Sequence, residues 1–378
     1  MKTALAFYAP LKPPDHPNPS GDRLLARLLM QALDTAGFDV RLASRLRSRD
    51  AAGRPEYQRR LEHLGERLAQ RLLRHWHREG WRPRLWFTYH LYYKAPDWIG
   101  PAVCRALDIP YIVAEASWAA KRADGPWERS HRQLRASLEQ AHRIFTFNPA
   151  DIPGLRQLLG ASAPVVELPP FVDLACFPEP PQPRSTVRAA LARRYGLAID
   201  CPWLVSVAMM RPGDKLASYR QLAAAFSRVQ SRCQLLLVGD GSARSEVAEA
   251  FAGDARVRFT GLLSPDQLIP LLGSCDLMVW PAVNEAFGMA LLEALALGLP
   301  TIAGDSGGVG TIVADGETGR LVPVDAPEHL ATAIEAVLKQ PEQLDRWRRA
   351  CRPRAESRHS LEAVAALLRR ELEPLGHA

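Results

Sequence analysis

The chain lacks the features that define several protein classes. Its 378 residues include six cysteines, which are scattered, without a short Cys pair or a Cys/His cluster. This pattern argues against a disulfide framework and a structural zinc site, and it is typical of a protein from a reducing compartment. No stretch approaches the roughly 20 apolar residues that a membrane-spanning helix needs.

Signals for targeting, metal binding and nucleic-acid binding are also missing. The N-terminal sequence "MKTALAFYAPLKPPDHP" has a short apolar run that leads into prolines, without a small-residue cleavage site. No Asp-x-Asp motif stands in a suitable loop, and no nucleic-acid-binding motif is present. We therefore expect a cytoplasmic protein that needs no metal ion or other cofactor and has no nucleic-acid partner.

The net charge of +7 is confined to the first half of the chain. Residues 1–180 hold 26 Lys and Arg against 19 Asp and Glu, whereas residues 181–378 hold 22 of each. Much of the excess lies in the arginine-rich stretch 41–84. A solvated helix face explains it, and so does a surface for an anionic partner. That partner would be phospholipid at the inner membrane face or a phosphorylated acceptor, and both explanations stay open.

Short apolar runs alternate with longer helical segments along the chain. In the first half, strands are predicted at 3–10, 39–44, 84–90, 110–116 and 143–148. An amphipathic helix is predicted at 56–78. In the second half, strands are predicted at 203–210, 233–241, 257–261, 276–282 and 300–305. The alternation predicts an α/β fold with two Rossmann-like, doubly wound domains.

The stretch at about 175–190 is rich in proline, has no regular periodicity and is predicted as the linker. The N-terminal domain then covers 1–180 and the C-terminal domain 181–355. A final helix at 356–378 is free to pack back on the N-terminal domain. Two such domains would face a central cleft at the carboxyl ends of their strands, where ligands bind in doubly wound folds.

Two carboxylates stand in the otherwise apolar stretch "NEAFGMALLEALALG", at Glu285 and Glu293. A helix is predicted to begin near Phe287, with Asn284 or Glu285 as its cap. Eight helical steps rise about 12 Å, a span comparable with that from a sugar ring to a ribose across a diphosphate. Taken alone, each glutamate is explained as a cap or an ion-paired helix residue. Together they suit the hydroxyl groups at the two ends of a nucleotide sugar, with the diphosphate at the helix amides.

Further loops of the second half follow strand ends. "MMRPGDK" places Arg211 and Lys215 just after a strand, and two cations there suit an anionic ligand. "VGDGSARSEV" has two glycines of a dinucleotide fingerprint, but Arg244 stands in place of the third, so a plain tight turn is preferred. "AGDSGGVGTIV" is a second glycine-rich turn, whose free amides could approach a phosphate.

These segments resemble a known family. "NEAFGMALLEALALGLPTIAGDSGGVG", with "VGDG", "VRFTG" and "TGRLVPVDAPEHLATAI", looks like the donor half of the GT-B glycosyltransferases of family 4. These are the retaining, group 1 enzymes with an E-x7-E motif. The match runs through most of residues 200–340, and "LPPFVDLACFP" resembles the family's domain junction. The first half matches only in its layout.

The resemblance implies retaining transfer from a nucleotide-diphosphate sugar to an acceptor sugar, glycolipid or small molecule. By analogy, Glu293 holds the ribose, Glu285 the sugar hydroxyls, and Arg211 and Lys215 the leaving diphosphate. "AMMRPGDKLAS" departs from the family's usual "GRL…KG", since no glycine precedes the Arg or follows the Lys. Further donor contacts are implied for Gly21, Gly239, Gly261, Leu262, Phe287, Gly288, Met289, Gly307 and Gly308.

The family often carries a histidine at the end of a first-domain strand, close to the sugar. Here Glu115 stands at that position, while His90 ends a neighbouring strand. We expect one of them near the acceptor hydroxyl, and buried structural roles stay open for both. Other functions also stay open. They are a GT-B epimerase or phosphorylase, a non-catalytic sugar-nucleotide-binding scaffold, and an arginine-rich nucleic-acid binder.

Overall fold

A computed structural model describes residues 2–18, 20–179 and 184–376. The chain divides into unit 1, Met1–Pro169 with Leu361–Ala378, and unit 2, Pro170–Ser360. The predicted boundary at residues 180 and 181 lies outside the described residues. The division falls earlier because Val172 donates its N–H to the His359 carbonyl at 3.0 Å, which joins the first residues of unit 2 to its last ones.

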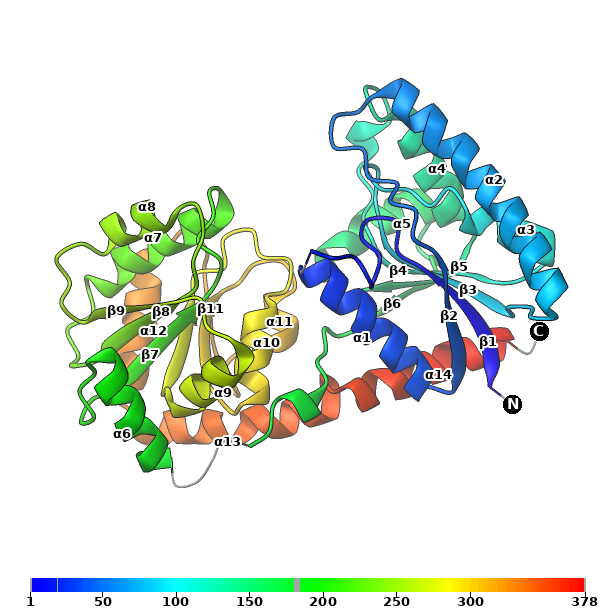
Figure 1. The fold of residues 1–378 in the computed structure, drawn as a ribbon. Coiled ribbons are helices and arrows are strands. Elements are labelled where there is room, and N and C mark those ends of the chain that lie inside the picture. Colours follow the sequence, from blue (N-terminus) through cyan, green and yellow to red (C-terminus); the bar gives the residue numbers. More distant parts are fainter. Residues whose placement is uncertain (1, 19, 180–183, 377–378) are drawn as a thin grey trace. The chain divides into compact units, whose positions relative to one another are not determined.

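Unit 1 is built on a six-stranded parallel sheet in the order β2-β1-β3-β4-β5-β6 (Figure 1). The strands are β1 (Thr3–Tyr8), β2 (Phe38–Ser44), β3 (Leu85–Leu91), β4 (Tyr111–Ala116), β5 (Ala141–Thr146) and β6 (Val165–Glu167). The order reverses between β1 and β3, which pair in register with Phe7 opposite Phe87. In doubly wound sheets, the carboxyl ends at such a reversal form the ligand site.

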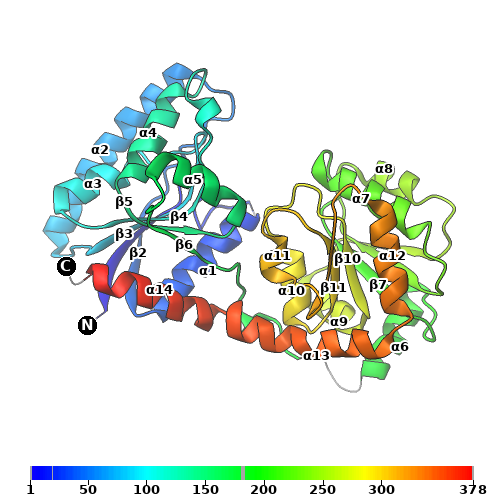
Figure 2. The same cartoon turned by 180° about the vertical axis from the view of Figure 1, so that it is seen from behind.

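Helices cover both faces of this sheet. They are α1 (Gly21–Thr35), α2 (Pro55–Glu79), α3 (Gly100–Leu107), α4 (Glu128–Glu139), α5 (Ile152–Leu159) and α14 (Leu361–Gly376). The final helix α14 packs against α1, where Arg369 donates to the Ala36 carbonyl at 2.7 Å (Figure 2). The helix predicted at 56–78 is present as α2. It begins at a proline and ends at Gly80, whose φ of 65° terminates the helix.

Unit 2 repeats the plan with the order β12-β11-β10-β7-β8-β9, again parallel. Its strands are β7 (Trp203–Val207), β8 (Gln234–Val238), β9 (Val257–Gly261), β10 (Leu277–Trp280), β11 (Thr301–Gly304) and β12 (Gly319–Val322). Its helices are α6 (Arg184–Tyr195), α7 (Asp214–Phe226), α8 (Arg244–Ala250), α9 (Pro265–Ser274), α10 (Met289–Ala296), α11 (Val309–Ile312), α12 (Pro327–Leu338) and α13 (Pro341–Arg358). On one face α7 packs on α8 and α12, and on the other α10 packs on α13.

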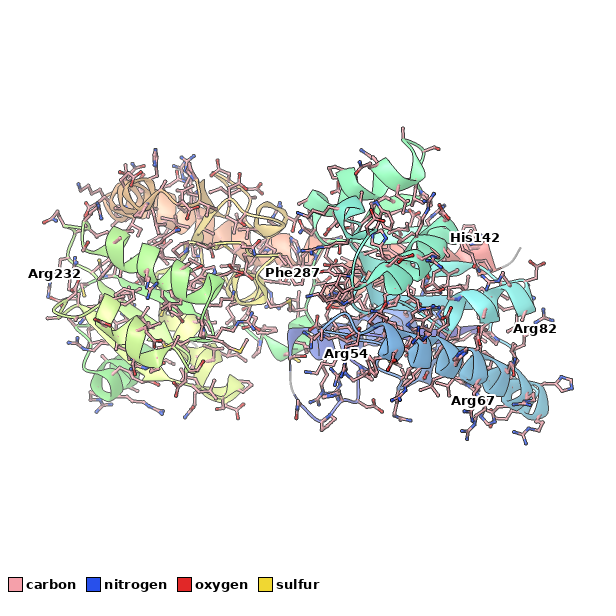
Figure 3. All side chains as sticks on the ribbon, turned by 90° about the horizontal axis from the view of Figure 1, so that it is seen from above. Arg54, Arg67, Arg82, His142, Arg232 and Phe287 are labelled. Carbon is pink, nitrogen blue, oxygen red and sulfur yellow. The ribbon has the colours of Figure 1, made fainter. Side chains whose placement is uncertain are left out.

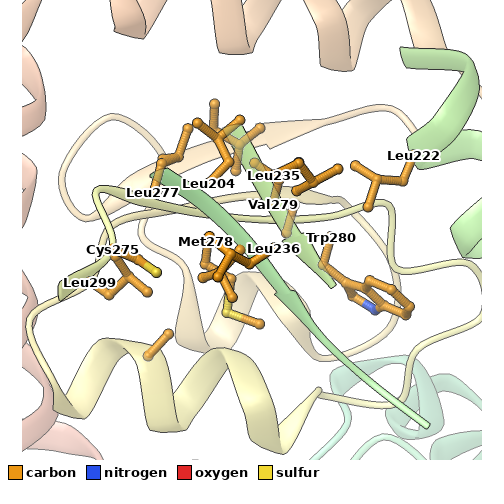
Figure 4. Close-up of a cluster of buried hydrophobic side chains, with 14 of the residues drawn as sticks. Leu204, Leu222, Leu235, Leu236, Cys275, Leu277, Met278, Val279, Trp280 and Leu299 are labelled. Carbon is orange, nitrogen blue, oxygen red and sulfur yellow. The ribbon is translucent and has the colours of Figure 1, made fainter. Parts of the chain in front are cut away.

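The central strands of unit 2 are apolar on both faces because helices cover both sides. Figure 4 shows Leu204, Leu235, Leu236 and Met278 in this core, and each of them is fully buried. The strand order reverses between β7 and β10. Their carboxyl ends therefore lie side by side, held by a rigid, close-packed sheet.

The structure and the fold comparison below confirm the predicted α/β class with two doubly wound domains. All ten predicted strands are present. Two edge strands, β6 and β12, were missed because they are only three and four residues long and carry polar side chains. The helix expected from Phe287 begins instead at Met289, because Gly288 adopts a φ of 80° that a helix does not allow.

Candidate functional site

Lys215 and Glu285 form an ion pair where the strand order of unit 2 reverses. Lys215 lies in the first turn of α7, after β7, and Glu285 lies in the loop that follows β10. The indole N–H of Trp280, the last residue of β10, donates to the same Glu285 oxygen at 3.1 Å. The Lys215 ammonium also lies 5.2 Å from the Trp280 ring centre. The site therefore holds both charges in fixed positions with little exposure.

The loop between β10 and α10 has a strained backbone. Ala282 and Asn284 have φ values of 58° and 48°, which non-glycine residues seldom adopt. The conformation is fixed from α7, since Val283 donates its N–H to Ser218 Oγ at 3.0 Å. The Asn284 side chain donates to Asp214 Oδ2, also at 3.0 Å. Strain of this kind persists only where surrounding contacts impose it, and it is common at binding sites.

The glycine turn after β11 supports the Glu285 loop. A Cβ on Gly307 would lie 2.2 Å from the Glu285 carbonyl oxygen, so only glycine permits this close approach. The Gly308 N–H donates to the Ala286 carbonyl at 2.5 Å, and Ser306 Oγ accepts the Glu285 N–H at 3.2 Å. The Gly308 amide, expected to be free for a phosphate, is therefore used within the protein.

The turn after β8 has a packing role, as the sequence favours. A Cβ on Gly239 would lie 2.0 Å from the Ala208 carbonyl, in the loop that follows β7. That loop also carries Arg211, whose side chain is exposed. Gly261 ends β9 with a φ of 73°, and Leu262 beside it is 79% exposed. These positions all lie at the carboxyl end of the unit 2 sheet.

Helix α10 begins at this edge with Gly288 as its N-cap, and no side chain caps it. The N–H groups of Leu291 and Leu292 donate to the Gly288 carbonyl, whereas those of Met289 and Ala290 have no hydrogen-bond partner among the described residues and can meet an anion. Phe287 is half-buried just before this start and is labelled in Figure 3. Glu285 therefore precedes the helix and does not cap it.

Glu293 lies within α10 and is largely withdrawn from water. Burial raises the pKa of its carboxyl to about 7. By accessible surface the residue is half-buried, and its carboxyl oxygens have no hydrogen-bond partner within the part of the chain that the structure describes. A carboxylate that is partly withdrawn from water and has no protein partner is suited to accept hydrogen bonds from a bound ligand.

A second group of titratable residues lies at the strand reversal of unit 1. His90 ends β3, and its Nδ1 lies 3.0 Å from Oδ1 of Asp22 in the first turn of α1. Burial acts to raise the pKa of Asp22, but the contact with His90 outweighs it and lowers this pKa below its ordinary value. Gly21 precedes Asp22, and a Cβ there would meet nothing within 4 Å, so space is open beside the helix start.

Glu115 lies on the neighbouring strand β4. Its Oε2 accepts the Phe147 N–H at 3.3 Å, and burial raises the pKa of its carboxyl. Burial also raises the pKa of Asp151 to about 6, against the opposing effect of His90. Both His90 and Glu115 have positive φ, at 64° and 59°. The structure thus places the two alternatives of the sequence on adjacent strand ends.

Sequence reasoning missed the partners of these residues. Trp280 and Ser306 hold Glu285, Asp22 holds His90, and Asp151 completes the unit 1 group. For Asp22 the sequence offers a local signal, because it directly follows Gly21, which the family resemblance implies as a donor contact. Within the described residues, no group of three or more His, Cys, Asp or Glu side chains could hold a metal ion. In the same residues, no helix has the length and apolar character to cross a bilayer.

Comparison with known proteins agrees with this fold. Residues 201–340 match the family model "Glycosyl transferases group 1". The chain is 31% identical over 180 residues to alpha-D-kanosaminyltransferase of Streptomyces kanamyceticus, covering 47% of this chain and 46% of that protein. It is 32% identical over 227 residues to D-inositol 3-phosphate glycosyltransferase of Xylanimonas cellulosilytica, covering 57% and 52%. The chain thus spans about half the length of these curated relatives.

Solved structures resemble the whole chain. Sucrose-phosphate synthase of Thermosynechococcus elongatus has a TM-score of 0.72 at 20% identity, covering 99% of both chains. HepE of Anabaena in complex with UDP has a TM-score of 0.73 at 15% identity, covering 99% of this chain and 100% of that one. At such identities the likeness establishes the fold. The comparisons therefore confirm the resemblance of this chain to the GT-B glycosyltransferases of group 1, with residues 201–340 carrying the family match.

Proposed function

We propose that this protein is a retaining glycosyltransferase that moves a sugar from a nucleoside-diphosphate sugar to an acceptor. The observation that carries the proposal is the Lys215–Glu285 ion pair at the strand reversal of unit 2, beside the uncapped start of α10. A lysine and free helix amides at one edge suit a diphosphate. HepE, a fold neighbour, is described in complex with UDP.

In this proposal the donor lies along the carboxyl edge of the unit 2 sheet. The unpartnered carboxyl of Glu293 accepts hydrogen bonds from the ribose, and Glu285 accepts them from the sugar hydroxyls. Cleavage of the glycosidic bond builds negative charge on the diphosphate. Lys215, Arg211 and the α10 amides stabilise that charge, which is the main catalytic contribution expected of the protein. The departing phosphate oxygen takes the acceptor proton.

In this proposal the titratable side chains at the strand reversal of unit 1 serve the acceptor. His90, held by Asp22, or Glu115 lies near the acceptor hydroxyl.

All six cysteines are free thiols, and five of them are buried, which supports a reducing, cytoplasmic location.

A basic face of α2 favours contact with an anionic membrane. Arg67, Arg71, Arg74 and Arg78 recur at intervals of four, three and four residues, so they share one face, and all are exposed. Figure 3 shows Arg67 on this helix. The four glutamates of α2 already pair with Arg59, Arg129, His63 and His75. We infer reversible binding of this face to anionic lipid, which cosedimentation with anionic and neutral vesicles tests.

The activity is tested with the full chain. A thermal-shift series of nucleoside diphosphates should reveal one base that raises Tm, because a ligand of the native state stabilises it by mass action. The matching nucleotide sugars are then incubated with acceptors, and NMR of the product should show the anomeric configuration of the donor. Release of a changed sugar without acceptor would identify an epimerase. Binding without turnover with any acceptor would identify a scaffold.

A further inference from the structure

A row of aromatic rings extends outward from His90 in unit 1. The ring centre of His90 lies 5.4 Å from that of Tyr92. Tyr92 lies 5.8 Å from Tyr93, and Tyr93 lies 5.5 Å from Trp127. Tyr92, Tyr93 and Trp127 are each half-buried, so part of every ring remains accessible. The row therefore begins at His90, close to the place proposed for the reacting acceptor hydroxyl.

The row is held rigidly. The indole N–H of Trp127 donates to the Asp50 carbonyl at 2.8 Å, and the Asp50 N–H donates to the Lys94 carbonyl at 2.8 Å. The Ala95 N–H closes a turn on the Tyr92 carbonyl at 2.9 Å. Rings fixed in this way present a preformed surface, and binding to it costs little ordering entropy. Flat, partly apolar ring faces suit the CH face of a sugar ring.

Two cations gather on the same rings. The Lys94 ammonium lies 5.6 Å from the Tyr93 ring centre and 5.0 Å from that of Trp127. The Arg122 guanidinium lies 5.5 Å from the Tyr93 ring centre. Neither cation is part of an ion pair within the residues that the structure describes. Two like charges around one ring repel each other, and a bound anion would remove that repulsion.

Five of the other cations that lie over aromatic rings have a carboxylate partner, whereas Arg194 over Tyr195 and Arg244 over Phe259 have none among the described residues. Arg41, over the Trp81 ring, has Asp39 as a partner at 3.5 Å. Lys215, over Trp280, pairs with Glu285. Lys94 and Arg122 differ from all of these because two cations without a carboxylate partner lie around the same Tyr93 ring, and this arrangement points to a negative charge supplied from outside.

We propose that Tyr92, Tyr93, Trp127, Lys94 and Arg122 form a subsite for an acceptor sugar that carries a phosphate or carboxylate group. The sugar ring lies against the aromatic faces, and the anionic group binds Lys94 and Arg122 through charge-assisted hydrogen bonds. The inference rests on the proposed glycosyltransferase function and names its acceptor class. The same chemistry is offered by a free sugar phosphate and by the headgroup of an anionic glycolipid.

Calorimetric titration of the full chain, saturated with the nucleoside diphosphate that raises its Tm most, tests the subsite. The probes are glucose 6-phosphate, glucuronate and neutral glucose. Both anionic sugars should bind at least about tenfold more tightly than glucose. The double variant Lys94→Ala/Arg122→Ala should lose this preference. Arg41→Ala, which removes a cation from the half-buried Trp81 ring of unit 1, should keep it.

Equal affinity for the three sugars, or a preference that survives in the double variant, would overturn the inference. Stabilisation by the nucleoside diphosphate reports on the proposed function separately. If that stabilisation is intact while the charge preference is absent, the subsite alone is wrong. If no nucleoside diphosphate binds at all, the proposed function is wrong as well. Cosedimentation with phosphatidylinositol vesicles distinguishes the sources. Vesicle binding that is lost in Lys94→Ala/Arg122→Ala indicates a lipid headgroup, and vesicle binding that is absent or unchanged in this variant indicates a free sugar phosphate or carboxylate.

Discussion

Lys215 and the indole of Trp280 donate to the same carboxylate oxygen of Glu285, which follows Lys215 by 70 residues in the sequence. The lysine is therefore held by the protein before any ligand arrives. A prepositioned cation stabilises developing charge without reorganising during the reaction, so its benefit is greatest in the transition state.

Lys215→Ala should lower kcat by about 10²–10³-fold, as expected when one stabilising donor of a developing oxyanion is lost. Arg211→Ala should act in the same direction. The affinity for the nucleoside diphosphate should change less, which calorimetry measures beside steady-state kinetics with varied donor. Arg232→Ala, a change at an exposed arginine of unit 2, is the control and should leave both unchanged. Equal losses in kcat and affinity would assign Lys215 to ground-state binding.

Glu293→Gln should uncouple donor binding from pH. Because burial raises its pKa to about 7, the wild-type carboxyl becomes charged near neutral pH, and ligand affinity should rise between about pH 6 and 8. The variant should bind the nucleoside diphosphate weakly at every pH, with kcat less affected. A variant that binds normally but does not turn over would place Glu293 at the reacting sugar.

The same substitution should stabilise the free protein at high pH. A carboxyl with a raised folded pKa contributes stability below its unfolded pKa of about 4.5. That stability is lost as pH rises through the folded value of about 7. We expect Glu293→Gln to gain about 1–2 kcal/mol relative to wild type at pH 8, and much less at pH 5. Urea denaturation at the two pH values measures the difference, and an equal gain at both would contradict the assignment.

Paired variants at His90 and Glu115 should identify the acceptor-side residue. On conversion to glutamine, the residue near the acceptor hydroxyl should lose about 10²-fold in kcat, as expected when a group that positions the reacting atoms is lost. Donor binding should be unchanged in both variants, since neither residue belongs to unit 2. Asp22→Asn should reproduce a partial loss only if His90 is the residue in question. Full activity in both glutamine variants would indicate that His90 and Glu115 have structural roles.

Because of His359, the free energy of unfolding of unit 2 should decrease in acid. Its Nδ1 lies 2.7 Å from the Pro170 carbonyl oxygen, and burial lowers its pKa to about 4. The neutral ring contributes stability above the unfolded pKa of about 6.5, and this is lost as pH falls toward 4. Between pH 7 and pH 5 the loss should be about 2 kcal/mol, measured by urea denaturation. His359→Gln should flatten this dependence, whereas the exposed control His63→Gln should not.

How much the sequence predicts depends on whether the signal is local. The helix α2 and the strand "LLLV" of β8 follow from periodicity within one segment, and both are present. The positions of Lys215 and Glu285 follow from strand ends, but their pairing depends on which strands are neighbours. Gly308 illustrates the limit in another way. The glycine-rich turn predicts that the Gly308 N–H is free to meet a phosphate, but this N–H donates to the carbonyl of Ala286, in the loop before α10.

The C-terminal helix α14 makes unit 2 an insertion within unit 1. Residues 361–376 complete the layer that covers α1, yet a ribosome synthesises them after all of Pro170–Ser360. A nascent chain can therefore finish the contiguous unit 2 while unit 1 still exposes an apolar helix face. Unit 1 is then the first to be started and the last to be completed, and a premature stop after residue 360 would leave a folded unit 2 attached to an unfinished unit 1.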